Sequence, residues 1–304
     1  MTDHDSDSLA QLSEALADAV ERGARSTVQV NGRNRVPASG VVWTADGAIV
    51  TTDHVLERDD EITVGLPDGS EVAATLAGRD PGSDLAVLRI EASGLVAAEQ
   101  APAGETRVGQ LVLALGRPSA GGPQASFGAV SAIGGAWRTF RGGRVDGYLR
   151  PDVTFYPGFS GGPLIDARGR VAGINSSQLR RGAGLTIPSA AVDEIATALL
   201  EQGRIRRGYL GVASQPVHLP EALAAKLDGQ DSGLLIVSVE DGSPAGAAGL
   251  LLGDILVRIE GTRLDDHGEL QAALGADRVG SATPLTVLRG GEVLEVSVTI
   301  GERS

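Results

Sequence analysis

Short apolar segments separated by glycine-containing turns run through most of this chain, and they constrain its fold more than any other feature. The 304 residues include 43 glycines, whereas aromatic residues make up only 3% of the sequence. Strand-length segments recur at intervals of roughly 8 to 12 residues with no amphipathic helix between them, which is typical of antiparallel barrels and sandwiches. The sequence therefore predicts a mainly β protein and disfavours a doubly wound α/β sheet.

Two hairpins are the clearest local examples of this pattern. The turn Asp46-Gly47 separates strands expected at residues 40–44 and 49–52, and Asp-Gly favours the tight turn of a two-stranded hairpin. A second hairpin is expected near the C-terminus, where Gly290-Gly291 separates two apolar segments. Both turns place neighbouring segments side by side as antiparallel strands.

An amphipathic helix is predicted ahead of the strands. It is expected to begin at Ser8, where Ser8 and Gln11 form a capping box, and to end near Gly23. Its apolar stripe has the 3.6-residue spacing of a helix face and consists of Leu9, Leu12, Leu16 and Val20. The polar residues 1–7 are expected to be frayed.

A second predicted helix, Ser189–Gln202, marks the end of the strand-rich region, and a basic hinge, Arg204–Arg207, follows it. A chain of 304 residues has the length of about two domains. We therefore predict four parts, namely an N-terminal helical segment (1–25), a first domain (26–188), a connecting helix (189–207) and a second domain (208–304).

The charge and composition argue against several classes of partner. With 39 acidic and 26 basic residues the formal net charge is -13, and such a field repels phosphate backbones and anionic headgroups. We expect no nucleic-acid partner, and no membrane insertion because no apolar run reaches the about 18 residues of a spanning helix. Cysteine is absent and the four histidines are scattered, so neither a metal site nor a cofactor is expected.

The N-terminal residues carry no secretory signal. The segment 1–8 is acidic, and it lacks the basic and apolar regions of an export signal. The absence of cysteine is compatible with either an oxidising or a reducing compartment. The sequence as written therefore predicts a cytoplasmic protein.

The strongest chemical motif is the segment 157–164, Pro-Gly-Phe-Ser-Gly-Gly-Pro-Leu. A nucleophilic serine needs an exposed hydroxyl and backbone N–H groups that converge on the developing oxyanion, and flanking glycines permit the tight turn that provides both. In such a turn Gly158, Phe159 and Ser160 would form the oxyanion hole, with the N–H groups of Gly158 and Ser160 as donors. The alternative is a glycine-rich surface turn that contains a serine.

Two upstream residues could complete a catalytic triad with Ser160. His54 follows the strand expected at 49–52, and Asp84 immediately precedes an apolar strand, a position that suits a buried carboxylate holding the imidazole. Taken singly, each residue also fits a surface position, and an aspartate before a strand is commonly a turn former. The order His, Asp, Ser on a strand-rich chain is more specific than any one of these residues.

Further motifs extend this order over most of the chain. They include Gly40-Val41-Val42, Thr52-Asp53-His54-Val55, Asp84-Leu85-Ala86-Val87-Leu88, Gly128-Ala129-Val130-Ser131, Gly173-Ile174-Asn175 and Ile187-Pro188-Ser189. In this order and spacing the sequence resembles the HtrA (Deg) serine proteases. The C-terminal part is similar to the PDZ domain of that family, since it opens with Arg207-Gly208-Tyr209-Leu210-Gly211-Val212. The resemblance spans residues 26–301.

The resemblance implies a chymotrypsin-like double β-barrel followed by a PDZ domain, which is an α+β fold with a small, partly open barrel. It implies an endopeptidase that cleaves unfolded or damaged polypeptides. By this resemblance Ser160 is the nucleophile, His54 is the general base and then acid, and Asp84 orients the imidazole. Asp80 is the competing carboxylate, but the family places the catalytic aspartate directly before the Leu-Ala strand.

Several features depart from the family pattern. Phe159 stands where the family usually has asparagine, which puts the substrate preference in doubt, and the loop 176–182 after Asn175 is short. The family's primary pocket accepts small aliphatic side chains, with Ile174 as a candidate lining residue here. Family members commonly form homotrimers through aromatic residues near the N-terminus, whereas residues 1–42 contain no Phe, Tyr or Trp.

The PDZ resemblance implies a binding site for peptide C-termini. PDZ domains add the peptide as a strand and receive its carboxylate on the N–H groups of a glycine-containing loop. The residues expected in this loop are Tyr209, Leu210, Gly211 and Val212. Leu270 and Leu274 share one face of a helix expected at 267–274 and could line the groove, although leucines at this spacing also fit a plain core.

Two other functions are compatible with parts of the sequence. Residues 158–162 also fit Gly-x-Ser-x-Gly, the nucleophile turn of α/β-hydrolases, but that fold needs alternating strands and helices before the serine. The second alternative is a catalytically inactive peptide-binding scaffold of the same double-barrel fold, and Phe159 is the feature that favours it. Labelling by a fluorophosphonate distinguishes the enzyme from the scaffold.

Overall fold

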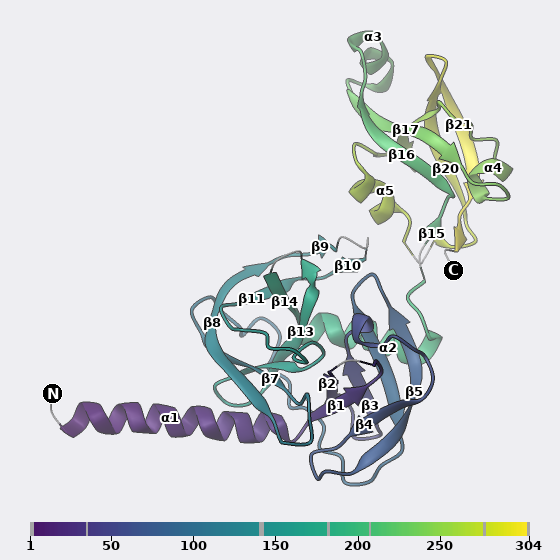
Figure 1. Ribbon diagram of the computed structural model, residues 1–304. Coiled ribbons are helices and arrows are strands. Elements are labelled where there is room, and N and C mark those ends of the chain that lie inside the picture. The colour runs from purple at the N-terminus through teal and green to yellow at the C-terminus, as the bar shows by residue number, and fades with distance from the viewer. Residues whose placement is uncertain are drawn as a thin grey trace. The chain divides into compact units, whose positions relative to one another are not determined.

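The computed structural model describes residues 3–34, 36–139, 143–180, 183–206, 208–275 and 278–302. The chain divides into two compact units, Met1–Ile205 and Arg206–Ser304, which can be followed by colour in Figure 1. The hinge predicted to end at Arg207 falls partly on a residue outside the described ones, as do residues 181 and 182 of the predicted loop.

Six antiparallel strands close the first barrel in the order β1-β2-β3-β6-β5-β4. Their bounds are β1 (Thr27–Asn31), β2 (Ala38–Val42), β3 (Ala48–Thr51), β4 (Ile62–Gly65), β5 (Glu71–Asp80) and β6 (Leu85–Ile90). The predicted hairpin at Gly47 is confirmed, because Val41 pairs with Val50 across it. Ile49, Ile62 and Leu88 are among the side chains that fill this barrel.

The second barrel closes in the order β11-β14-β13-β12-β7-β8. Its strands are β7 (Leu111–Gly116), β8 (Gln124–Gly134), β11 (Tyr148–Pro151), β12 (Pro163–Asp166), β13 (Val171–Arg180) and β14 (Ala183–Pro188), and the short strands β9 (Trp137–Arg138) and β10 (Arg144–Val145) pair beside it. A shared apolar cluster joins the two barrels, with Val50 and Leu85 on one side and Ile174 and Leu185 on the other. The predicted double barrel is therefore confirmed.

The N-terminal helix α1 (Asp3–Ala24) is longer than predicted. Ser8 and Gln11 lie inside it, and the Gln11 side chain donates to Asp7 at 3.2 Å instead of closing a capping box. The predicted start at Ser8 is wrong because aspartate and serine are as favourable in the first turns of a helix as in a loop. Most of α1 is exposed and only its last turns are buried against the barrels, so the helix extends beyond them in Figure 1.

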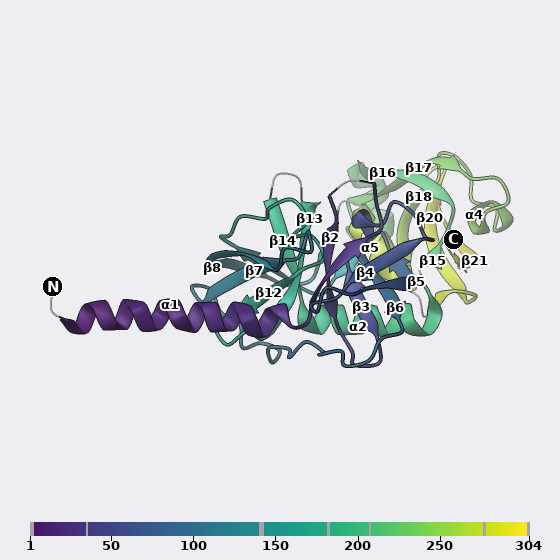
Figure 2. The same ribbon diagram turned by 60° about the horizontal axis from the view of Figure 1, so that its bottom comes forward.

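The predicted second helix is confirmed as α2 (Ser189–Gln202). It ends at Gly203, whose φ of 74° lies in the left-handed region that glycine adopts without strain. Pro188 is its N-cap, whereas the Ser189 hydroxyl donates to the carbonyl of Val171. α2 packs against β5 and β6 of the first barrel and β13 of the second, and Figure 2 shows it running along both barrels.

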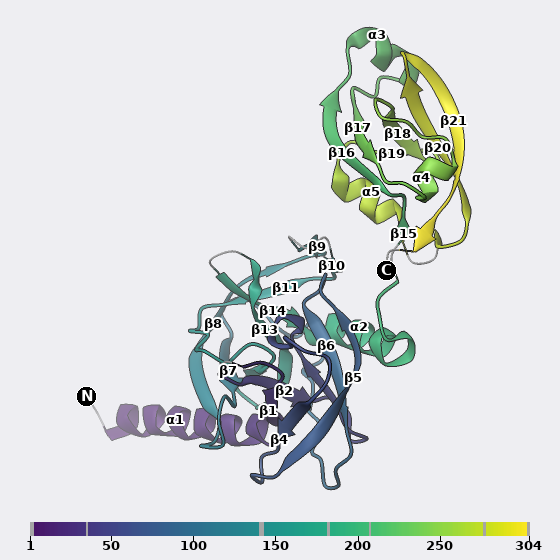
Figure 3. The same ribbon diagram turned by 45° about the vertical axis from the view of Figure 1, so that its right-hand side comes forward.

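The C-terminal unit is built on a sheet with the order β16-β17-β18-β20-β21, to which β19 pairs through β18. The strands are β15 (Gly208–Tyr209), β16 (Val212–His218), β17 (Ser232–Val239), β18 (Ile255–Ile259), β19 (Thr262–Arg263), β20 (Ala282–Arg289), β21 (Glu292–Thr299) and β22 (Gly301–Glu302). The helices are α3 (Glu221–Ala224), α4 (Pro244–Ala247) and α5 (His267–Ala273), with a 3-10 turn at Ala225–Leu227. α5 lies beside β16 (Figure 3). The predicted hairpin at Gly290-Gly291 is confirmed by the pairing of β20 with β21.

Candidate active site

His54 and Asp84 are brought together by the pairing of β3 with β6. His54 lies on a 3-10 turn (Asp53–Val55) directly after β3, and Asp84 immediately precedes β6. The imidazole Nδ1 lies 2.8 Å from Oδ2 and 2.9 Å from Oδ1 of Asp84, and both side chains are buried, at 6% and 5% exposure. Because Nδ1 faces the carboxylate, Nε2 is the ring nitrogen left to exchange a proton with a substrate or a nucleophile.

The Asp84 carboxylate is held by three groups. Besides the imidazole, its Oδ1 accepts the backbone N–H of His54 at 3.1 Å, and its Oδ2 accepts the hydroxyl of Ser176 at 2.5 Å. Ser176 belongs to β13 of the second barrel, so this carboxylate links the two barrels. Asp84 itself has a φ of 60°, a left-handed conformation that is uncommon outside glycine.

Asp80, the competing carboxylate, has a different environment. Its oxygens accept the backbone N–H groups of Gly82 at 3.2 Å and Ser83 at 2.9 Å, which is the pattern of an aspartate that stabilises its own turn. The structure therefore places Asp84, and not Asp80, against the imidazole.

Ser160 lies on the loop between β11 and β12, and it lines a pocket of about 390 Å³ together with His54. The Ser160 hydroxyl is 2.9 Å from the hydroxyl of Ser177 and accepts the Ser177 N–H at 3.3 Å. Within the described part of the chain, no hydrogen bond joins the hydroxyl of Ser160 to the imidazole of His54. Of the predicted triad, His54 and Ser160 thus line one pocket, with Asp84 behind His54 and the Ser160 hydroxyl bonded to Ser177 of β13.

The loop before Ser160 is fixed by a bond to the first barrel and by a bond within the loop. Gly158 has a φ of 90°, and a β-carbon there would lie 2.5 Å from Pro118 Cβ and 2.7 Å from the carbonyl of Pro37, so only glycine fits. The hydroxyl of Ser39 donates to the Gly158 carbonyl at 2.7 Å, and the N–H of Phe159 donates to the Tyr156 carbonyl at 3.0 Å. The peptide between Gly158 and Phe159 is therefore held at both ends.

Two amides of this loop have the character of oxyanion donors. No acceptor is found for the N–H of Gly158 or of Ser160 among the residues that the structure describes. The carbonyl of Ser160 accepts the Ser39 N–H at 3.1 Å, and the carbonyl of Phe159 accepts the Gly162 N–H at 3.0 Å. The Phe159 carbonyl belongs to the peptide that carries the Ser160 N–H, so its bond to Gly162 can hold that N–H toward a developing negative charge.

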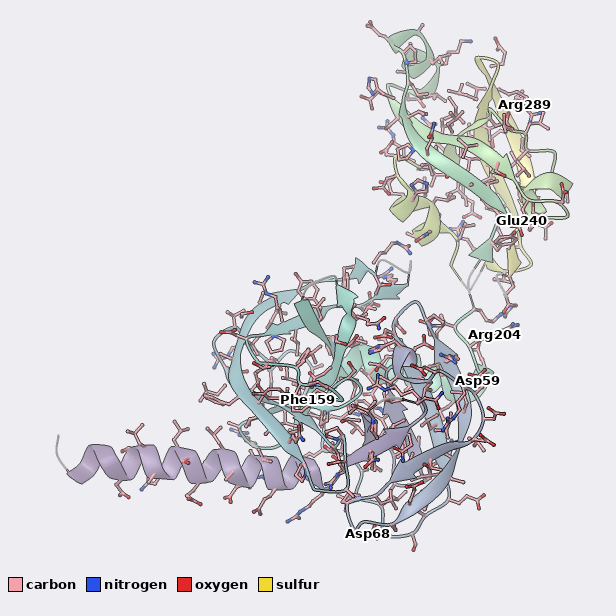
Figure 4. The ribbon with its side chains drawn as sticks, in the orientation of Figure 1. Asp59, Asp68, Phe159, Arg204, Glu240 and Arg289 are labelled. Carbon is pink, nitrogen blue, oxygen red and sulfur yellow. The ribbon has the colours of Figure 1, made fainter. Side chains whose placement is uncertain are left out.

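Phe159 does not line the pocket. Its side chain is fully buried in the core of the second barrel, as its place among densely packed side chains in Figure 4 illustrates. The ring makes an edge contact with Tyr156, with centroids 5.4 Å apart, and it fills the space beside Gly116. Phe159 therefore adds to the core and borders the pocket only through its contact with Tyr156.

The candidate pocket residue Ile174 is also placed elsewhere. It is fully buried in the cluster between the barrels, whereas the pocket is lined by Arg33, Val36, His54, Phe155, Tyr156, Pro157, Gly158, Ser160, Ser177 and Gln178. The expectation of a loop after Asn175 is corrected as well, since residues 176–180 continue β13. An unbroken run without Gly or Pro up to Arg180 was the signal in the sequence for this longer strand.

A buried arginine connects this loop to the end of α1. Arg117 donates through Nε to the carbonyl of Thr27 at 2.8 Å and through Nη2 to that of Ala24 at 3.2 Å, and burial lowers the pKa of Arg117. Its backbone N–H donates to the Ser39 hydroxyl at 2.8 Å, the same hydroxyl that bonds Gly158. Nothing in the sequence marks this network, because its members come from separate segments.

The predicted carboxylate loop of the C-terminal unit has the geometry of a tight turn. Gly211 has a φ of 79°, and the carbonyls of Leu210 and Gly211 accept the N–H groups of Ala245 and Glu240. The Tyr209 hydroxyl bonds the carboxylate of Glu240, which is labelled in Figure 4. In the described ranges the N–H groups of Leu210 and Gly211 have no acceptor. Val212 begins β16 after the turn.

The predicted groove residues lie on α5. Leu270 is buried in the core of this unit, and Leu274 packs against the same core while remaining partly exposed. His267, the first residue of α5, donates from Nε2 to the carbonyl of Ser214 on β16 at 2.7 Å. This bond joins the helix to the strand beside it, and the position of His267 at the helix start is its only mark in the sequence.

In the described ranges, no group of three or more His, Asp or Glu side chains could hold a metal ion. No helix in the same ranges is both long and apolar enough to cross a bilayer.

Comparisons with known proteins identify the family of this chain. Residues 38–174 match the family described as "Trypsin-like peptidase domain", and residues 208–300 match the family described as "PDZ domain". The solved structure "HtrA-type protease AlgW with tripeptide" is 31% identical with a TM-score of 0.74, and the match covers 95% of this chain and 97% of that one. The chain belongs to the HtrA family of serine proteases.

Other relatives of this HtrA chain are proteases by name. The serine endoprotease from Yersinia pestis is 29% identical with a TM-score of 0.77, covering 95% of this chain and 98% of that one. A Halomonas elongata protein named "Probable periplasmic serine endoprotease DegP-like" is 36% identical over 269 residues, which are 87% of this chain and 56% of that protein. The HtrA chain therefore spans a little over half the length of the curated relatives that it matches.

These names correct the predicted location. The cytoplasmic prediction for the HtrA chain is contradicted, because the curated relatives are named periplasmic endoproteases. The prediction was drawn from the first residues alone, whereas export depends on a removable segment that leaves no trace in the folded domains.

Proposed function

We propose that this protein is a serine endopeptidase that cleaves unfolded or damaged polypeptides and that its PDZ domain binds peptide C-termini. The observation that carries the proposal is that His54, paired with the buried Asp84 at 2.8 Å, lines one pocket together with Ser160. Like the relatives named periplasmic, it would act outside the cytoplasm.

The proposed reaction is acyl transfer. Ser160 Oγ attacks the peptide carbonyl while its proton moves to Nε2 of His54, and the carbonyl electron pair moves to the oxygen. The N–H groups of Gly158 and Ser160 stabilise this oxyanion. His54 then protonates the leaving amine, and water repeats the sequence on the acyl-enzyme. Asp84, bonded to Nδ1, stabilises the imidazolium at each stage.

The decisive experiment combines a covalent label with a cleavage map. A fluorophosphonate should label the wild-type protein and not the Ser160→Ala variant, and casein fragments mapped by mass spectrometry should appear only with wild type. Removal of Ser160 or His54 should lower turnover by about 10⁶-fold. A folded wild type that is neither labelled nor active would favour the inactive peptide-binding scaffold.

The peptide-binding part of the proposal rests on the turn at Gly211. A β-carbon at Gly211 would lie 2.2 Å from Ser243 Cβ, so Gly211→Ala should deform the loop and abolish peptide binding. Gly242→Ala is the matched control, because Gly242 also has a positive φ, of 70°, but open space around it. Fluorescence anisotropy would measure the binding of one peptide, with a free or an amidated C-terminus, to the wild type and to each variant. Equal binding of the two peptides to the wild type would contradict carboxylate recognition.

The homotrimer implied by the family resemblance stays a prediction. Static light scattering of the full chain should give three times the mass of one chain if the prediction holds, and a single-chain mass would contradict it.

A further inference from the structure

Ser177 is the closest hydrogen-bonding neighbour that the structure gives to the proposed nucleophile. Its hydroxyl lies 2.9 Å from Ser160 Oγ, and its backbone N–H donates to the same oxygen at 3.3 Å. Both groups belong to β13, whereas His54, which lines the same pocket, lies on the 3-10 turn that follows β3. One residue therefore contacts the Ser160 hydroxyl twice.

These contacts occupy the bonding capacity that proton transfer needs. A serine hydroxyl has one proton to donate and two lone pairs. If Ser160 donates its proton to Ser177, that proton does not point at the imidazole. If Ser177 is the donor, Ser160 Oγ accepts from both the hydroxyl and the N–H of Ser177, and neither of its lone pairs is free to attack. In the first arrangement the proton of Ser160 is committed to Ser177, and in the second both lone pairs of Ser160 Oγ are committed to Ser177.

We propose that Ser177 is a positioning residue that holds the Ser160 hydroxyl in a resting orientation until a substrate displaces it. The inference rests on the proposed protease function and adds a residue that regulates access to the nucleophile. It involves no additional chemical step.

The strand around Ser177 is rigid enough to impose this orientation. The neighbouring Ser176 is fixed by its 2.5 Å bond to Asp84, and its hydroxyl also accepts the N–H of Gln178 at 3.2 Å. Ser177 is exposed to solvent, unlike the buried Ser176, so a polypeptide entering the pocket can compete for its hydroxyl. Displacement of this bond frees the Ser160 hydroxyl to turn toward Nε2.

The test compares two variants of equal shape that differ in one hydroxyl. Ser177→Thr keeps the hydroxyl and Ser177→Val removes it, and both residue types suit a strand. The Val variant should be labelled by a fluorophosphonate about 2- to 12-fold faster than the Thr variant, the ratio that corresponds to one net hydrogen bond. With a peptide substrate, the Val variant should have a higher kcat than the Thr variant. The KM values and the melting temperatures of the two variants should be equal. Ser177→Ala offers a second hydroxyl-free variant if Val folds poorly.

The outcomes separate this inference from the proposed function. Equal labelling rates for the Val and Thr variants, or slower labelling of the Val variant, would overturn the role of Ser177 while leaving the protease intact. Absence of labelling in wild type and in every folded variant would overturn the proposed function and this inference with it. Ser131→Ala controls for unspecific effects of removing a serine hydroxyl. The hydroxyl of Ser131 donates to the carbonyl of Arg150, away from the pocket.

Discussion

Gly116 and Phe159 are complementary in shape: a β-carbon on Gly116 would lie 2.6 Å from Cδ1 of Phe159. The ring therefore occupies the space that any other residue at position 116 would need. Since Phe159 precedes the proposed nucleophile, its packing in the core of the second barrel also fixes the loop that carries Ser160.

Gly116→Ala should lower the free energy of unfolding by about 1–3 kcal/mol, because the added methyl group overpacks a filled core. The loss should shrink when Phe159→Ala is also present, since the smaller side chain vacates the space. Thermal and denaturant unfolding of the two single variants and the double variant measure this coupling. Gly135→Ala, at an exposed glycine with no neighbouring atom in reach, should change stability by about 0.5 kcal/mol or less. Additive losses at positions 116 and 159 would contradict the packing argument.

Ser39→Ala should reduce kcat by about 10-fold, the factor that corresponds to one lost hydrogen bond on the oxyanion loop. The hydroxyl of Ser39 donates to the Gly158 carbonyl, so its removal frees the peptide that follows Gly158 to rotate. Steady-state kinetics on a peptide substrate should show the change in kcat with KM little altered. Ser26→Ala is the control, because Ser26 is also buried but its hydroxyl donates to the carbonyl of Gly23 and not to the loop before Ser160. A Ser39 variant with unchanged kcat would show that the loop holds its shape without this bond.

Arg117→Met should lower the free energy of unfolding by about 2 kcal/mol, because the apolar side chain leaves the carbonyls of Ala24 and Thr27 buried without their donors. Methionine keeps much of the arginine's length, so the loss reports the hydrogen bonds rather than a cavity. Denaturant unfolding measures it. Arg150→Met removes an exposed guanidinium and should cost about 0.5 kcal/mol or less. Equal losses in the two variants would mean that the carbonyls find other donors.

The pair of Asp254 and Arg289 should make the C-terminal unit sensitive to acid. The side chain of Arg289, labelled in Figure 4, bonds both oxygens of the buried Asp254 at 2.8 and 2.7 Å and thereby lowers the pKa of Asp254. A carboxylate whose folded pKa lies below its unfolded value adds stability at neutral pH, and this stability is lost as pH falls from the unfolded value, about 4, through the folded one.

Asp254→Asn removes this titration and should lower the melting temperature at pH 7 more than at pH 3. Calorimetry of the full chain across this pH range follows the transition of the C-terminal unit. Asp228→Asn, at an exposed partner of Arg258, should leave the pH dependence close to that of wild type. A wild-type profile that is flat below pH 5 would contradict the assignment to Asp254.

Local patterns predicted the elements whose residues are close in the sequence. The hairpin at Gly47 and the helix ending at Gly203 follow from glycine in the left-handed region. The order of His54, Asp84 and Ser160 in the sequence predicted a shared site. Strand pairing in the first barrel can bring His54 and Asp84 together, and Ser160 comes from the second barrel. The approach of His54 to Asp84 follows from the register of β3 and β6, in which Thr51 pairs with Ala86.

The remaining features depend on where side chains point in three dimensions. Phe159 could line a pocket or fill a core, and only the space beside Gly116 decides between them. Ile174 is a predicted pocket residue, whereas in the structure its side chain packs between the barrels. The bond between Ser177 and Ser160 joins residues of a strand and a loop, and no spacing rule links the two. The link from Arg117 to Ser39 is equally invisible, because its donor is the main-chain N–H of Arg117, a group that nearly every residue type carries.

The guanidinium of Arg117 also limits how this protein can be dissected or fused to other chains. One of its acceptors is the carbonyl of Ala24, the last residue of α1, so a fragment that starts at β1 would leave a buried cation facing fewer peptide dipoles. An excised protease module should therefore retain the C-terminal turns of the helix. A partner domain is best attached to the solvent-exposed N-terminal turns of α1. A fusion there leaves the bonds from the buried Arg117 guanidinium to the main-chain carbonyls in place.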